Sequence, residues 1–248
     1  MSSPPARPRL ATHLMFGVLA AVAVAGFAWL GRWQWHRAAE KRAIAAAFQA
    51  GMSAPVQPLE GRSTESLPRY AHVAARGAYD GERQFLLDNL SRDGRAGYEV
   101  LTPLRLDDGR WLLVNRGWLP LSGGGRQQLP AIRLGQAALD TRTVAGRLDD
   151  LPVTGLSAGR APPTTDAQWP KLTSFPHAAE LGVALGARVE TRQLLLDANE
   201  PDGYRRDWQP SSAGFGPERH LSYAVQWWSL AALVVVVYVY MTVRSVRG

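Results

Sequence analysis

Two apolar segments decide how this chain folds: LMFGVLAAVAVAGFAWL at residues 14–30 and LSYAVQWWSLAALVVVVYVYMTV at residues 221–243. Neither segment contains a charged side chain. At a rise of about 1.5 Å per residue, the second segment can cross a hydrocarbon core of roughly 30 Å. The first segment is shorter and needs Ala11–His13 or the Trp-rich turn after Leu30 to complete a span. We therefore expect two transmembrane helices near the ends of the chain.

The sequence between these segments is long enough for one domain with its own core. Trp29, Trp33 and Trp35 form the kind of aromatic belt that lies at a membrane surface. The next residues are rich in Ala, Glu, Lys and Arg, so we expect the helix to continue to Gly51. The predicted parts are an N-terminal tail (1–13), a transmembrane helix (14–30), a helical extension (31–50), an extramembrane domain (51–219), a second transmembrane helix (221–243) and a C-terminal tail (244–248).

Beyond a connector rich in Pro and Gly, the helical period gives way to short runs rich in Val, Leu, Tyr and Trp. Asp107-Asp108-Gly109 is a hairpin signal, because Gly tolerates the positive φ of a tight turn. We also expect a helix from about Pro176 to Leu185, with Ser174 as a candidate cap. The expected strands are 70–79, 84–90, 98–106, 111–118, 143–148 and 188–197.

The predicted fold class is thus a membrane protein in which two transmembrane α-helices near the termini bracket one mainly antiparallel β (α+β) extramembrane domain. Gly17, Ala21 and Ala25 form a small-residue stripe on the first helix. Such a stripe allows a second helix to approach closely, and here it suits either the second span or a partner protein.

The formal charge of +7 does not indicate nucleic-acid binding, because the arginines are scattered and are not interleaved with aromatic residues. There is no cysteine, which excludes disulfides and thiolate metal sites. If both segments span, seven cations lie at one membrane face: Arg32, Arg37, Lys41, Arg42, Arg205, Arg206 and Arg219. Charge alone leaves the topology undecided, because long loops are translocated largely regardless of charge.

The first segment has an alternative interpretation as a cleaved signal peptide, with Ala23-Val24-Ala25 as the cleavage site. The apolar run continues past that site to Leu30 and ends in the aromatic and basic belt. A retained span explains this continuation, so we favour it.

Gly155-Leu156-Ser157-Ala158-Gly159 matches the nucleophile elbow of serine hydrolases, and Asp166 and His177 follow in the order of a triad. The elbow requires a helix directly after it, and Pro162-Pro163 would fall inside that helix. We therefore expect no catalytic residues. The histidine spacings also predict no helix-borne zinc site.

His220 immediately precedes the second apolar segment, so its imidazole should lie at the membrane surface, at about the depth of Trp33 and His36. An imidazole there could be the axial, metal-binding ligand of a haem whose propionates pair with Arg37 and Arg219. A simple interfacial histidine that caps the helix fits the same spacing. His36 shares a helical face with Trp29 and Trp33 and is either a partner for His220 or a solvated side chain.

Five motifs follow one another along the chain: Gly31-x-Trp33-Gln34-x-x-Arg37-x-x-x-Lys41, Arg69-Tyr70-x-x-Val73-x-x-x-Gly77-x-Tyr79-Asp80, Gly97-Tyr98-x-Val100-x-Thr102-Pro103-Leu104, Val114-Asn115-Arg116-Gly117-Trp118-x-Pro120 and His220-Leu221-x-Tyr223-Ala224-x-Gln226-Trp227-Trp228. In these motifs the chain resembles the SURF1 family of cytochrome c oxidase assembly factors, and the resemblance covers nearly its whole length.

This resemblance implies a non-enzymatic factor that binds haem a and assists its insertion into subunit I of the oxidase, with haem a synthase as a further expected partner. It implies His220 as the ligand and Trp33 as a packing neighbour, whereas His36 lies outside the family motifs. It also implies contact with membrane lipid, both termini in the cytoplasm and the central domain in the periplasm. The short stretch before the first segment favours a bacterial inner (plasma) membrane over a mitochondrial inner membrane.

A second hypothesis is a scaffold that stabilises an assembly intermediate of subunit I without binding haem. In that case the β surface and Asn115–Pro120 would carry the contacts. Asn115–Pro120 also reads as a β-core and turn signature, so the sequence leaves its role open.

Overall fold

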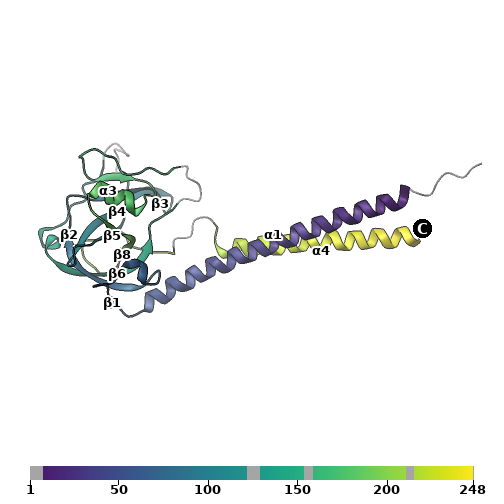
Figure 1. Cartoon of the computed structure of the whole chain (residues 1–248), viewed down its shortest axis with the longest axis horizontal. Coiled ribbons are helices and arrows are strands. Elements are labelled where there is room, and N and C mark those ends of the chain that lie inside the picture. Colours follow the sequence, from purple (N-terminus) through teal and green to yellow (C-terminus); the bar gives the residue numbers. More distant parts are fainter. Residues whose placement is uncertain (1–7, 122–128, 154–158, 211–214, 248) are drawn as a thin grey trace, which may run out of the picture. The chain divides into compact units, whose positions relative to one another are not determined.

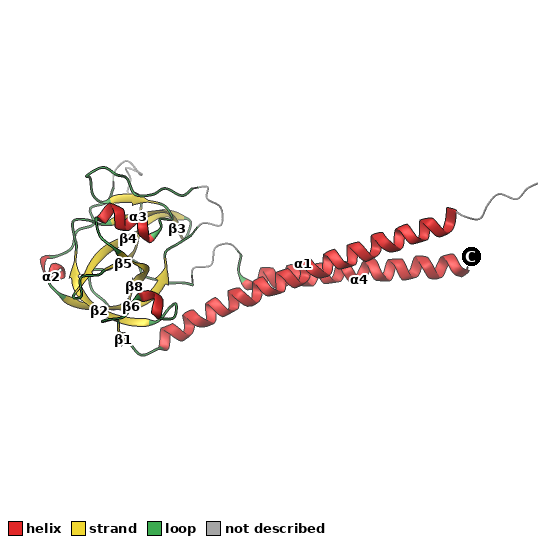
Figure 2. Ribbon diagram, in the orientation of Figure 1, coloured by secondary structure: helices red, strands yellow, loops and turns green. Residues whose placement is uncertain are grey.

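The computed structural model describes residues 8–121, 129–153, 159–210 and 215–247 (Figures 1 and 2). The chain divides into two compact units. One unit comprises Met1–Ala45 and Gly214–Gly248, and the other comprises Ala46–Ala213. The first is helical and the second contains the strands.

Two long helices carry the apolar segments. Helix α1 spans Pro8–Ser53, and helix α4 spans Pro217–Arg247. Both are long and apolar enough to cross a membrane. Helix α4 begins at a proline, which has the backbone angle of a first helical position and lacks only an N–H that would be unpaired there. The expected fold class, two apolar helices around a β-rich domain, is confirmed.

The contact between α1 and α4 follows a seven-residue repeat. The helices meet at Gly17 with Tyr238, and at Phe27 with Trp227. Such a repeat keeps one row of side chains facing a partner when two helices wind around each other with a left-handed supercoil. The partly or fully buried row on α1 is Gly17, Ala20, Val24, Phe27, Gly31, Gln34 and Ala38.

The predicted small-residue stripe is therefore only partly the contact face. Gly17 adjoins α4, but Ala21 and Ala25 are exposed. Residues spaced strictly by four move gradually around the helix, away from the face that contacts α4. Residues on that face are spaced alternately by three and by four positions.

The β unit contains one eight-stranded sheet in the order β1-β2-β6-β8-β5-β4-β3-β7 (Figure 2). The strands are β1 (Gln57–Pro58), β2 (His72–Tyr79), β3 (Phe85–Arg92), β4 (Arg95–Leu106), β5 (Trp111–Pro120), β6 (Arg142–Asp150), β7 (Lys171–Thr173) and β8 (Val189–Leu196). Three short helices accompany them: η1 (Thr64–Ser66), α2 (Gln136–Leu139) and α3 (Ala178–Leu185).

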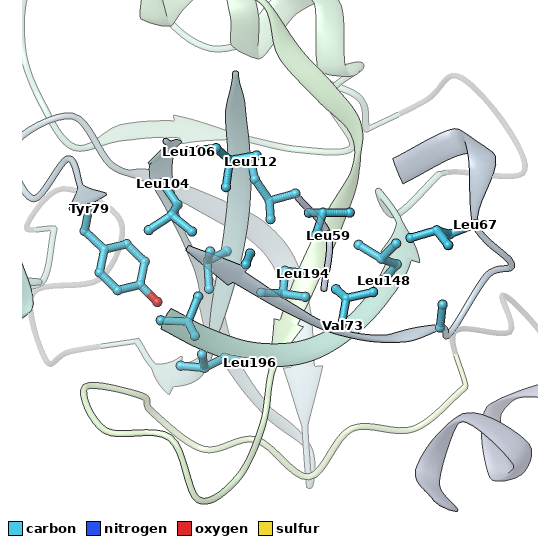
Figure 3. Packing of buried hydrophobic residues seen from close by; sticks show 14 residues of the cluster. Leu59, Leu67, Val73, Tyr79, Leu104, Leu106, Leu112, Leu148, Leu194 and Leu196 are labelled. Carbon is cyan, nitrogen blue, oxygen red and sulfur yellow. The ribbon is translucent and has the colours of Figure 1, made fainter. Parts of the chain in front are cut away.

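The sheet closes on itself through a second pairing of β2. Gly77–Tyr79 of β2 pair with Leu104–Leu106 of β4, in addition to the β2–β6 ladder. Strands β2, β6, β8, β5 and β4 thus form a ring around one apolar core. Figure 3 shows Leu104, Leu112 and Leu194 inside it, each at 0% exposure. Burying one such leucine contributes about 1.5–3 kcal/mol.

All six predicted strands are present, and the sheet is mainly antiparallel as expected. Strand β8, however, pairs with β5 in parallel, and the short parallel strands β1 and β7 were not predicted. The hairpin at Asp107-Asp108-Gly109 forms, with Gly109 at φ 84°.

Two local predictions were wrong. The N-cap of α3 is His177, whose backbone N–H donates to the Glu180 carboxylate, whereas Ser174 is buried and pairs with Ala161. Helix α1 does not stop at Gly51 but continues to Ser53. Gly51 serves close packing instead, because a Cβ there would lie 2.4 Å from the Tyr70 carbonyl oxygen.

The last turns of α1 belong to the β unit and are held by a buried charged cluster. Asp197 accepts bonds from Arg147 at 3.0 Å and from the His72 imidazole at 2.6 Å. The same guanidinium donates to the Gly51 carbonyl, and the other His72 nitrogen lies 3.1 Å from the Ala54 carbonyl. Asp197 therefore orients two side chains that satisfy carbonyls at the end of the helix.

Replacing Asp197 with alanine should destabilise the β unit. Removing one partner of a buried ion pair costs about 3–5 kcal/mol, which for a unit of this size lowers the melting temperature by roughly 10 °C. Thermal unfolding of the detergent-solubilised protein measures the shift. Asp107→Ala is the matched control, because it removes an ion pair to Arg76 whose side chains are 47% and 61% exposed. Equal shifts for the two variants would contradict this role of Asp197.

Candidate functional site

The candidate site centres on His220 in the first turn of α4. Its Nδ1 lies 2.7 Å from the amide oxygen of Gln34 on α1. An amide oxygen can only accept a hydrogen bond, so Nδ1 carries the proton and donates it. In the neutral ring Nε2 is then unprotonated, and it has no hydrogen-bond partner among the described residues.

A close approach of the two helices fixes this pairing. A Cβ added to Gly31 would lie 2.3 Å from the indole Nε1 of Trp228, so only glycine fits at that position. Ala224 and Ala38 are both 0% exposed in the same helix pair. Small residues therefore hold the helices at a distance at which Gln34 can reach His220.

Two aromatic pairs also join α1 and α4. Phe27 stacks on Trp227 with 5.6 Å between ring centroids, and Trp35 lies 5.9 Å from Trp228. Trp33 is 46% exposed and has no aromatic partner among the described residues. Its ring thus presents an open apolar surface one position away from Gln34 in the sequence.

The predicted cations divide into two groups. Arg37 pairs with Glu40 at 2.7 Å in an exposed contact, and the Arg219 guanidinium lies 4.3 Å from the centre of the exposed Phe215 ring. Both belong to the helical unit and remain accessible to an anion. Arg205 and Arg206 are instead bonded within the β unit, to Asp93 and Asp207 and to backbone carbonyls respectively.

His36 is exposed, and no hydrogen bond joins it to a described residue. The structure gives Gln34, and not His36, as the partner of His220. A role for His36 at the site stays a prediction.

These residues fit a haem better than a bare metal ion. The described residues contain no group of three His, Cys, Asp or Glu side chains that could hold an ion. A haem iron takes four ligands from its own macrocycle and needs only axial donors from the protein. An imidazole whose Nε2 has no hydrogen-bond partner among the described residues is chemically suited to be one such donor.

A family model described as the SURF1 family matches residues 21–232, which include the β unit and the parts of α1 and α4 that adjoin it in sequence. The chain belongs to the SURF1 family. Membership implies a role in the assembly of cytochrome c oxidase, and together with the two apolar helices it indicates an inner-membrane protein. The SURF1 family is a family of assembly factors and is not known for catalysis. No curated protein matched the chain.

The first four residues of the SURF1 motif at Asn115–Pro120 are buried in the β unit, whereas Leu119 is partly buried and Pro120 is exposed. Asn115, Arg116 and Trp118 are 0%, 2% and 4% exposed, so these side chains cannot carry contacts to a client, as the scaffold hypothesis had assumed. Arg116 donates to Gln84 and to the Asp202 carbonyl, and burial lowers the pKa of its guanidinium. The segment is a β-core element, the other interpretation left open by the sequence.

The hydrolase interpretation gains no support from the described part of this SURF1 protein. Ser157 lies outside the described residues. Asp166 is held by the Gln168 backbone N–H and by Lys171, whereas His177 caps α3. No hydrogen bond joins Asp166 to His177 in the described chain.

Sequence reasoning missed three residues of the site: Gln34, Gly31 and Trp228. All three lie within the SURF1 motifs that flank the two helices. An amide and a glycine have no distinctive chemistry in isolation, so only the pairing of the helices reveals that Gln34 orients an imidazole and that Gly31 admits an indole ring.

Gly31→Val should separate α1 from α4, because the added side chain collides with Trp228. We expect a lower melting temperature and a shifted tryptophan emission spectrum in detergent. Gly26→Val is the matched control, since it lies in the same helix and a Cβ there has no neighbour within 4 Å. If both variants behaved alike, intrinsic helix propensity and not close packing would explain the need for Gly31.

Proposed function

We propose that this protein binds haem a through Nε2 of His220 and assists its insertion into subunit I of cytochrome c oxidase. The observation that carries the proposal is the hydrogen bond from His220 Nδ1 to Gln34. A metal-binding histidine typically donates its second ring N–H to an oxygen, which fixes the tautomer and orients the ring. Gln34 provides this arrangement before any ligand arrives.

The other predicted site residues have complementary roles. The exposed face of Trp33 packs against the macrocycle, while Arg37 and Arg219 pair with its propionates. When bound, haem a would supply an iron atom that the His220 imidazole would ligate. Arg37 and Arg219 are both exposed, which suits a carrier that must release its cargo.

We further propose that the protein lies in a bacterial inner membrane, with the β unit in the periplasm and both termini in the cytoplasm. The site would then act at the outer membrane face, where the protein could receive haem a from its synthase and pass it to subunit I. In this role it moves a cofactor and breaks no covalent bond, so it needs no catalytic residue.

A scaffold for a subunit I intermediate is the second candidate function, and one feature of the β unit favours it. A cleft of about 600 Å³ is lined by three arginines and two acidic residues, among others: Arg83, Arg105, Arg133, Asp80 and Glu82. Arg83 pairs with Asp80 at 2.7 Å. Arg105 and Arg133 are exposed and form no ion pair with a described residue. An acidic segment of a client protein would complement them.

Purification of the protein from cells that synthesise haem a tests the main proposal. Wild-type protein should carry haem with a defined absorption spectrum, and His220→Ala should lose it. His177→Ala, on the β unit, serves as the matched histidine control and should retain haem. Haem-free wild-type protein, together with crosslinking to subunit I that survives His220→Ala, would instead favour the scaffold.

Gln34→Leu tests the orienting role separately. Loss of the oxygen acceptor frees the His220 ring and its tautomer, so haem affinity should fall by about 10–100-fold while the ligand itself remains. Titration of the apoprotein with haem, followed by absorption and magnetic circular dichroism, measures this change. Gln34→Asn, which shortens the side chain but keeps the amide, should give an intermediate result. An unchanged affinity for Gln34→Leu would remove Gln34 from the site.

A further inference from the structure

A second feature of the helix pair lies at the opposite end from His220. There a groove of about 570 Å³ runs between α1 and α4. Its walls include Phe16, Ala20 and Ala23 from α1 and Leu233, Val237 and Met241 from α4. The groove is separate from the proposed haem site, and it shares no lining residue with it.

The groove exists because small and large side chains alternate at this end of the pair. At Gly17 the helices are close, and an added Cβ would lie 2.9 Å from the Tyr238 hydroxyl. Ala20 and Ala23 then leave space opposite the longer side chains of α4. In a membrane such a space is filled by an apolar group, since a void forfeits dispersion contacts.

The lining of the groove becomes polar at the end of the helix pair that carries the chain ends. It includes His13, Thr242 and Ser245, and the two hydroxyls donate to backbone carbonyls of their own helix. Arg244 and Arg247 lie in the last turn of α4 and form no ion pair with a described residue.

No counter-charge for these cations lies nearby on the described helices. The acidic residues of the helical unit are Glu40 and Glu218, which both lie towards its opposite end. An apolar groove that ends at Ser245, in the turn of α4 that also carries the unpaired Arg244 and Arg247, matches a ligand with an anionic head and a hydrocarbon tail.

We propose that this groove binds an anionic phospholipid of the leaflet at the chain ends. One acyl chain lies between α1 and α4, and the phosphate faces His13, Arg244 and Arg247. The inference does not depend on haem binding, because no group in the groove contributes to that site.

A lipid fits this groove better than a transmembrane helix of a partner. Helix–helix contacts in membranes favour small residues on the docking face, which let two backbones approach. Here Phe16, Leu19 and Met241 line the groove with large, flexible side chains. Its volume also lies in the range of roughly 300–1,000 Å³ that accommodates a small molecule.

Native mass spectrometry of the full-length protein in detergent tests the proposal, with phosphatidylglycerol and phosphatidylcholine as probes. We expect preferential retention of phosphatidylglycerol. Ala23→Trp fills the groove and should weaken that binding on the order of tenfold. Ala21→Trp places the same ring on the exposed side of α1 and is the matched control. Ala23→Leu is a milder filling variant and should give a partial loss if the tryptophan prevents folding.

Charge is tested by Arg244→Gln combined with Arg247→Gln, which should reduce the preference for phosphatidylglycerol on the order of tenfold. The control variant, Arg32→Gln combined with Arg42→Gln, removes two cations from the half of α1 that lies far from the groove. This variant should leave the preference for phosphatidylglycerol unchanged. Equal retention of both lipids, or equal losses in the groove variant and its control, would overturn the proposal. A wild-type dimer that Ala23→Trp converts to a monomer would show a second copy in the groove and would also overturn it.

Discussion

The contact between Gly31 and Trp228 is the constraint on which the candidate site depends. A side chain larger than hydrogen at position 31 has no room beside the indole ring. This contact brings α1 and α4 close together at position 31. The hydrogen bond between Gln34 and His220 joins the same two helices three residues further along α1. The ligand geometry is thus a property of the helix pair and not of either helix alone.

The two units contain different kinds of polar chemistry. In the helical unit, polar groups are few and partly exposed, so a bound molecule can reach them and leave again. In the β unit, several charged side chains are buried and form ion pairs with each other, as Asp197 does with Arg147 and His72. Such networks make a structure rigid when every member has a partner. The cofactor site we infer therefore lies in the adaptable unit, and the interior of the other unit is fixed.

Much of this architecture could be predicted, because the signals are local. Charge-free segments predict spans, and alternating residues in His72–Tyr79 predict a half-buried strand. The hairpin at Asp93-Gly94 carries the same Asp-Gly turn signal as the predicted hairpin at Asp108-Gly109. Asp93 and Gly94 both have positive φ. The parallel pairing of β5 with β8 and the bond between Gln34 and His220 join residues far apart in sequence. Single-sequence patterns contain no information on such pairings, whereas the family motifs mark the residues without stating their geometry.

Closure of the sheet through β2 and β4 limits how a client protein could be recognised. A paired strand has no free backbone edge, and the outer strands β1 and β7 are only two and three residues long. Strand β7 pairs with β3 along one side. The hydroxyl of its last residue, Thr173, donates a hydrogen bond to the Ala161 carbonyl. Recognition by addition of a strand requires a long open edge, and the pairings in the described part of the sheet leave a short one on β3 beyond Leu87, where its ladder with β7 ends. Selection of a client would therefore depend on side-chain shape and charge, which can diverge while the closed sheet stays the same.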